Sequence, residues 1–134
     1  MMGFYDRSQS PEQISKLLII SGIYQSMSLD KTDRLVWFNV VDTTNCIIGV
    51  AVVKKGFVAQ LHLHEEAEDY YFLWGVGRLA LGDEISIVRA PKRVHIPGNL
   101  PHAMTPLSQF VILVYTFAKG PFENIRYRYL NSKL

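Results

Sequence analysis

The segment LHLHEEAEDYYFLWG, Leu61 to Gly75, places titratable side chains inside a run that is otherwise typical of a buried strand. His62 and His64 are two positions apart, so on an extended strand both imidazoles point to the same face, about 7 Å apart at ~3.3 Å per residue. After a turn, Glu68 opens a second strand-like run, from which its carboxylate can return to the same point. Converging imidazoles and a carboxylate predict a metal site, because coordination lowers the cost of burying such groups.

A fourth ligand, His102, is available at the end of the segment HIPGNLPH, His95 to His102. The prolines, Gly98 and Asn99 indicate a tight loop. His95 has no predicted partner, and we interpret it as structural or exposed. Nitrogen and oxygen donors without a thiolate suit one divalent ion of Fe, Mn, Ni, Co, Cu or Zn better than a closed structural zinc site. The predicted ligand set is His62, His64, Glu68 and His102.

Much of the remaining chain consists of short apolar runs separated by turn residues. Gly82-Asp83 between two such runs is a strong hairpin signal. The expected strands cover residues 34–41, 46–53, 57–64, 68–74, 78–81, 84–88, 93–96, 110–118 and 124–130. Many short strands with Gly and Pro turns favour a sandwich or a barrel.

The N-terminal region has a different pattern. Ser10-Pro11-Glu12-Gln13 is a capping box with proline at the first helical position, which predicts a helix over about 11–25. Leu17 and Leu18 belong to its apolar face. The predicted organisation is therefore an N-terminal segment, 1–33, followed by a β-domain over 34–130.

Composition limits the class of protein. The 134 residues are enough for one domain, and 49% hydrophobic with 19% charged residues is typical of a globular chain. A net charge of +2, without a basic stripe, argues against nucleic-acid binding. The lone Cys46 favours a reducing compartment, the N-terminus lacks the order of a signal peptide, and no apolar run reaches ~18 residues. We therefore expect a cytoplasmic protein without a membrane span.

The spacing of Gly56, His62-Leu63-His64, Glu68 and Gly75 resembles the first cupin motif at every fixed position. The segment PGNLPH, 97–102, resembles the centre of the second cupin motif, with Asn99 at a glycine position. Asparagine accepts a positive φ better than most residues, so the turn can be kept.

Two positions of the second motif depart from the family pattern. Pro91 replaces its opening glycine and Pro106 its closing asparagine, and neither position is a metal ligand in the family. Fifteen residues, Val76 to Ala90, separate the two motifs, which fits small single-domain members. The resemblance covers about residues 54–119.

This resemblance implies a single antiparallel jelly-roll barrel with one metal ion in its mouth, held by the four predicted ligands. Members of the family include dioxygenases, sugar isomerases, lyases and decarboxylases. We therefore expect a metal-dependent enzyme acting on a small polar molecule, with a non-catalytic binding module for a small ligand or metal as the alternative. Small cupins also commonly pair, which implies a homodimer.

Alternation along the strand that begins at Glu68 defines the expected pocket, since every second side chain shares a face. The predicted pocket residues are Gln60, Tyr70, Phe72, Trp74 and Met104. A carboxylate bound to metal is a poor general base, so Tyr70 and Tyr115 are the candidate acid–base residues. The inward or outward orientation of Tyr115 is left open by the sequence.

Overall fold

The computed structural model describes residues 34–133. The helix predicted over about 11–25, and the segment 1–33 that contains it, lie outside the described residues. Within the described range, no helix is long and apolar enough to cross a membrane.

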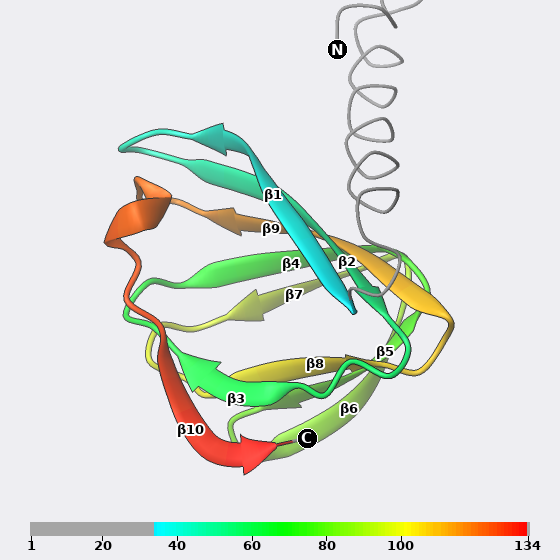
Figure 1. The fold of residues 1–134 in the computed structure, drawn as a ribbon. Coiled ribbons are helices and arrows are strands. Elements are labelled where there is room, and N and C mark those ends of the chain that lie inside the picture. Colours follow the sequence, from blue (N-terminus) through cyan, green and yellow to red (C-terminus); the bar gives the residue numbers. More distant parts are fainter. Residues whose placement is uncertain (1–33, 134) are drawn as a thin grey trace, which may run out of the picture. The chain divides into compact units, whose positions relative to one another are not determined.

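The described chain is mainly β, as predicted, and Figure 1 shows its strands arranged in two sheets. All observed strand pairings are antiparallel, and the strand orders are β1-β2-β9-β4-β7 and β10-β3-β8-β5-β6. The elements are β1 (Leu35–Asp42), β2 (Ile47–Lys54), β3 (Gln60–Leu63), β4 (Glu68–Trp74), β5 (Val76–Leu81), β6 (Glu84–Arg89), β7 (Lys92–Ile96), β8 (His102–Pro106), β9 (Phe110–Phe117), the 3-10 helix η2 (Phe122–Asn124) and β10 (Arg128–Lys133).

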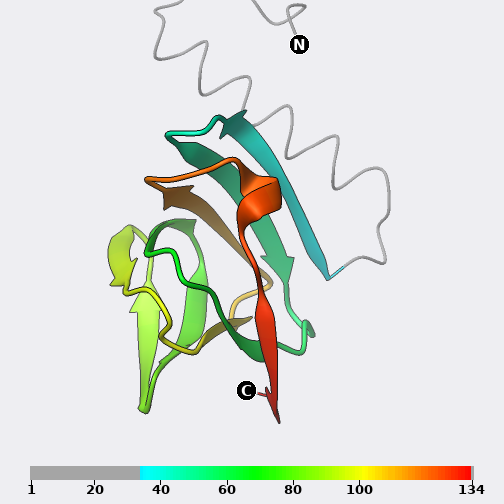
Figure 2. The same ribbon diagram turned by 90° about the vertical axis from the view of Figure 1, so that its left-hand side faces the viewer.

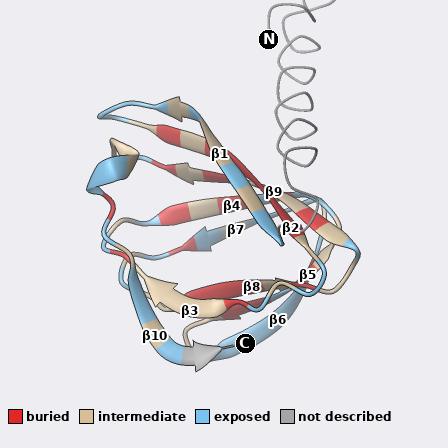
Figure 3. Ribbon diagram, viewed as in Figure 1, coloured by how far each residue is buried: buried red, intermediate tan, exposed pale blue. Residues whose placement is uncertain are grey.

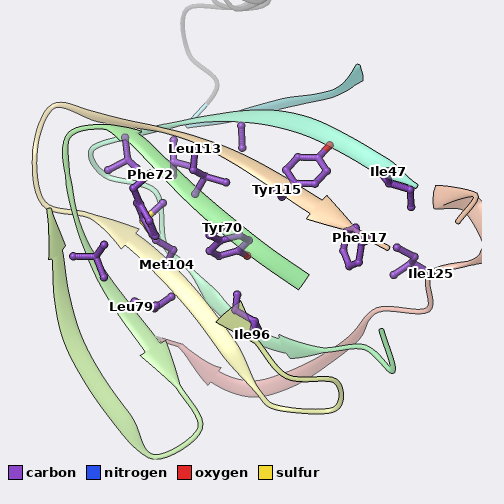
Figure 4. Packing of buried hydrophobic residues seen from close by; sticks show 14 residues of the cluster. Ile47, Tyr70, Phe72, Leu79, Ile96, Met104, Leu113, Tyr115, Phe117 and Ile125 are labelled. Carbon is purple, nitrogen blue, oxygen red and sulfur yellow. The ribbon is translucent and has the colours of Figure 1, made fainter. Parts of the chain in front are cut away.

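The two sheets face each other (Figure 2). Their inward side chains form one apolar core. Strand β9 shows the alternation of buried and partly exposed side chains that is typical of a strand with one face in the core. Its buried residues are Val111, Leu113, Tyr115 and Phe117. Phe72 of β4 reaches the same interior (Figure 4). Burying a side chain of this size stabilises the fold by about 1.5–3 kcal/mol. Figure 3 shows that the buried residues lie mainly on the central strands, whereas the edge strand β6 is mostly exposed.

The loop between β7 and β8 packs against the loop that follows β3. Asn99 has a φ of 62°, so the expected positive φ at this position is confirmed. Its backbone N–H donates to the carbonyl of His64 at 2.7 Å, and a β-carbon on Gly98 would overlap the carbonyl oxygen of Glu65. This close backbone approach brings the second motif next to the first.

The observed strands differ from the expected ones in three places. Strand β3 begins only at Gln60, and the predicted strand over 124–130 is replaced by η2 and a later β10. Strand β8 was not predicted, because Pro101 precedes it and Pro106 is its last residue, and proline is depleted in strands. It pairs with β5 from His102 opposite Leu81 to Pro106 opposite Gly77.

Candidate metal centre

Three histidines converge on the inner side of the sheet that contains β3 and β8. His62 and His102 are direct partners across these strands, with ring centroids 4.3 Å apart. His64 immediately follows β3, and its ring lies 5.0 Å from that of His102. One ligand nitrogen from each ring lies within 4.8 Å of the other two, so the three rings can hold one metal ion.

Hydrogen bonds fix the orientation of each ring. Nδ1 lies 3.1 Å from the Gln60 carbonyl in His62, 2.8 Å from that of Glu66 in His64, and 2.8 Å from that of Leu100 in His102. A carbonyl oxygen only accepts, so Nδ1 carries the proton in each ring and Nε2 is the atom left for coordination.

The buried nitrogen of His102 provides a direct test of whether the site fits a metal. His102 is only 1% exposed, and its Nε2 makes no well-formed hydrogen bond among the described residues, although Oε1 of Glu68 lies 3.3 Å away. Buried polar atoms without a partner are costly and rare in native proteins. Three imidazole nitrogens with nitrogen–metal distances of about 2.0–2.1 Å are a common donor set for divalent transition metals. The residues therefore fit a bound metal ion.

Glu68 lies at the start of β4, in the opposite sheet. Its Oε1 is 3.2 Å from Nε2 of His64 and 3.3 Å from Nε2 of His102. It thus contacts two of the three histidines, although it is not part of the group whose ligand atoms all converge. The carboxylate is buried at 4% exposure, beside these two histidines.

The charges in the metal-free site are coupled. Burial opposes a charge on His62 and, with the neighbouring His102, lowers its pKa to about 4. Burial also opposes a charge on His64, but the hydrogen bond to Glu68 and the charge of that carboxylate raise its pKa above the ordinary value. Burial opposes ionisation of Glu68 as well, and its contacts with His102 and His64 nevertheless lower its pKa. His62 is therefore neutral at neutral pH, as a metal ligand must be.

A cavity of about 340 Å³ leads to this site from between the two sheets. Its walls are mainly apolar and aromatic. The lining residues are Leu35, Trp37, Ala51, Val53, Phe57, Ala59, Gln60, His62, Glu68, Tyr70, Ala103, Met104, Leu113, Tyr115, Phe122, Tyr127 and Tyr129.

The structure places the predicted pocket residues in three different surroundings. Gln60, Tyr70 and Met104 line the cavity. Phe72 does not line it and is packed in the core at 1% exposure. Trp74 also lies away from the cavity, since it is 60% exposed and stacked on Phe110. The pairing of β4 with β9 is irregular between Phe72 and Trp74, so the alternation that predicted a shared face ends there.

The two candidate acid–base tyrosines differ in their hydrogen bonds. Tyr115 faces inward, and its hydroxyl donates to Oδ1 of Asn39 at 2.7 Å. The hydroxyl of Tyr70 has no hydrogen-bond partner within residues 34–133, and its ring centroid lies 6.2 Å from that of His102. Burial raises the pKa of Tyr70 well above the ordinary value, so its hydroxyl is protonated at neutral pH. Tyr70 thus holds a proton that no neighbour in the described chain shares.

Four lining aromatics were missed by the sequence reasoning, namely Phe57, Phe122, Tyr127 and Tyr129, and Trp37, whose orientation the sequence leaves open, also lines the cavity. Tyr127 lies 5.5 Å from the ring of His62 and 5.1 Å from that of His64. Alternating aromatics in Tyr127-Arg128-Tyr129 are the only local signal for them. That signal does not show that β10 pairs with β3, which is what brings these rings to the histidines.

The fold and site can be compared with known proteins. No protein-family model matches the chain. It is 29% identical over 86 residues to dimethylsulfoniopropionate lyase DddW of Ruegeria pomeroyi, a match that covers 64% of this chain and 57% of that protein. It is 30% identical over 76 residues to oxalate decarboxylase OxdC of Bacillus subtilis, covering 53% of this chain and 20% of that protein. The matches thus span little more than half, or much less, of the length of these relatives.

Several solved structures have a fold similar to that of this chain. An RmlC-like cupin from Shewanella frigidimarina superposes with a TM-score of 0.63 at 17% identity, covering 70% of this chain and 84% of that one. A variant of Bacillus subtilis oxalate decarboxylase OxdC gives 0.60 at 27% identity, covering 72% and 28%. A dimethylsulfoniopropionate lyase DddQ from Ruegeria pomeroyi gives 0.63 at 17%, covering 72% and 51%. With the motif at residues 56–75, these neighbours confirm the expected resemblance to small cupins, and the described chain has the fold of these proteins.

Proposed function

We propose that this protein is a metal-dependent enzyme of the lyase or decarboxylase type, which acts on a small organic carboxylate in the mouth of the barrel. The observation that carries the proposal is the set of three converging imidazoles, each with its Nδ1 bonded to a backbone carbonyl, of which His62 lines a 340 Å³ cavity together with Glu68. Support for the reaction type comes from the relatives, which are named as a dimethylsulfoniopropionate lyase and an oxalate decarboxylase. Both named substrates carry a carboxylate.

In this proposal His62, His64 and His102 hold one divalent ion, and Glu68 is the fourth ligand. A bound divalent ion supplies a Lewis acid that polarises a substrate oxygen and stabilises developing negative charge. The chain's own contribution is orientation, because the three backbone carbonyls keep the imidazoles from rotating. The apolar lining also keeps most water away from the reacting atoms.

Proton transfer falls to the hydroxyl of Tyr70. It lines the cavity beside His102, and no other hydrogen bond in the described chain holds its proton. Tyr115 is less suited to this role because its hydroxyl donates to Asn39. Glu68 is already engaged with two histidines. Tyr70 is therefore the proposed acid–base residue, and Tyr115 the proposed positioning residue of the pocket wall.

The second candidate is a non-catalytic module that binds a small ligand or the metal alone. It is favoured by the scarcity of acid–base groups, since Glu68 is the one acid of the described lining and already contacts two histidines, which leaves tyrosine hydroxyls as the other candidates. In that case Tyr70 would contribute only to affinity.

The test begins with metal analysis of protein purified without a tag or chelator. The native metalloprotein is then assayed with oxalate, dimethylsulfoniopropionate and other small carboxylates, in the presence of O₂. Tyr70→Phe is expected to keep the metal and to lose roughly 10²-fold or more in rate. Tyr71→Phe is the matched control, because Tyr71 lies next in sequence and its ring is on the exposed side of β4. Tight binding without turnover of any carboxylate would instead support the binding module.

A further inference from the structure

Five aromatic side chains form a continuous wall of the cavity, which we call the aromatic wall: Trp37, Tyr115, Phe122, Tyr127 and Tyr129. Phe122 is its centre, with ring centroids 5.2 Å from Trp37, 6.1 Å from Tyr127 and 6.4 Å from Tyr115. These rings are tilted by 41–50° to that of Phe122, so the wall is curved rather than flat. Tyr129 stacks on Tyr127 at 6.3 Å.

The wall runs from the histidines, where Tyr129 is 62% exposed, to Trp37. Tyr127 lies 5.5 Å from His62 and Tyr129 lies 5.8 Å from it, measured between ring centroids. At the other end Trp37 is 49% exposed. A molecule of only a few heavy atoms can therefore touch the aromatic wall with one end and reach the histidines with the other.

The charges of the lining are unusual for a site that is to take a carboxylate. The lining, drawn from the described residues, contains no lysine or arginine, and Glu68 is its only acid. An anionic group has no basic side chain to bind there, except at the metal-binding histidines. Aromatic rings present their negative faces to a ligand and attract cations, and curved sets of rings are used to recognise methylated onium groups. An onium group also carries no N–H that would need an acceptor when it leaves water.

We infer that the aromatic wall receives a methylated onium group, an ammonium or a sulfonium, of a molecule whose carboxylate lies toward the histidines. The inference deepens the proposed function by naming its substrate class as small onium carboxylates, and it rests on that function for the position of the carboxylate. A primary amine is disfavoured because its N–H donors would find few acceptors on this wall. A neutral apolar group of the same shape would fill the cavity but would lose the attraction to the rings.

The test compares pairs of ligands that differ only in charge. Isothermal titration calorimetry is performed with choline and with 3,3-dimethylbutan-1-ol, in which a tert-butyl group replaces trimethylammonium. The second pair, glycine betaine and 3,3-dimethylbutanoate, is titrated into the metal-loaded protein. Each onium ligand is expected to bind roughly five- to thirtyfold more tightly than its neutral-headed partner. Equal affinities, or tighter binding of the tert-butyl compounds, would overturn the inference.

Variants locate the effect on the aromatic wall. Phe122→Leu and Tyr127→Leu keep an apolar side chain but remove a ring, and each is expected to reduce the onium preference at least threefold. Tyr127→Phe keeps the ring and is expected to retain the preference. Circular dichroism checks that each variant is folded. Preference unchanged in both leucine variants, when folded, would contradict the assignment to this wall.

The failure of the inference can be separated from the failure of the proposed function. The double variant His62→Ala/His64→Ala is expected to lose the metal and to retain the preference for choline over its isostere. A wild-type protein that binds no metal but prefers choline would support the inference and overturn the proposed function. A protein that binds metal and shows no onium preference would support the proposed function and overturn the inference.

Discussion

Replacing His62 by alanine should abolish the stabilisation of this protein by metal while changing the metal-free protein little. In the metal-free state the ring of His62 makes one hydrogen bond, to the carbonyl of Gln60 in its own strand. Losing such a bond costs about 0.5–1.5 kcal/mol. In the metal-bound state the same substitution removes one of the three converging nitrogens.

The expected size of the metal effect follows from linkage. An ion present at a hundredfold excess over its dissociation constant stabilises the folded state by about 2.7 kcal/mol. For a domain of 60–100 residues, each kcal/mol raises the melting temperature by roughly 4–8 °C. Wild-type protein should therefore gain roughly 10–20 °C on metal loading, and His62→Ala should gain little.

The assay is thermal unfolding followed by circular dichroism, with and without metal, after chelator treatment. His95→Ala is the matched control, because this histidine is 56% exposed and its Nδ1 lies 3.0 Å from Oδ1 of Asp69, outside the predicted ligand set. It should show the full wild-type shift, since an exposed pair of this kind contributes about 0–1 kcal/mol. A shift in His62→Ala as large as in the control would refute the assignment of the metal site.

Three other outcomes are expected. Gly49→Ala should lower the free energy of unfolding, measured by urea titration, by about 1–3 kcal/mol, since a β-carbon there would overlap the ring of Tyr115; unchanged stability would contradict this packing. In chelator-treated protein, NMR should give His62 a titration midpoint near its pKa of about 4. Because that pKa lies below the unfolded value of 6.5, protonation of this group lowers the stability of the folded state as the pH falls from 6.5 toward 4. A midpoint near 6.5 would be inconsistent with the burial of this ring. Light scattering at micromolar concentration should give the mass of a homodimer, and a monomer mass would exclude it.

Local geometry explains which parts of the fold and site could be predicted from the sequence. The common face of His62 and His64, the hairpin turn at Gly82-Asp83 and the positive φ of Asn99 depend on a few neighbouring residues. Side-chain alternation and turn chemistry act over this range, so the pattern of residue types determines them. The mainly β, antiparallel character of the domain follows from the same short-range signals.

Tertiary structure decided what depends on pairing between distant segments. His102 reaches His62 because β8 pairs with β3, although the prolines before and at the end of β8 favour a loop. Tyr127 reaches the histidines because β10 pairs with β3 from the far end of the chain. Trp74 leaves the cavity because of an irregularity in the pairing of β4 with β9. Each outcome is set by the register between strands, and a shift of one residue reverses the face that every side chain presents, which no short stretch of sequence specifies.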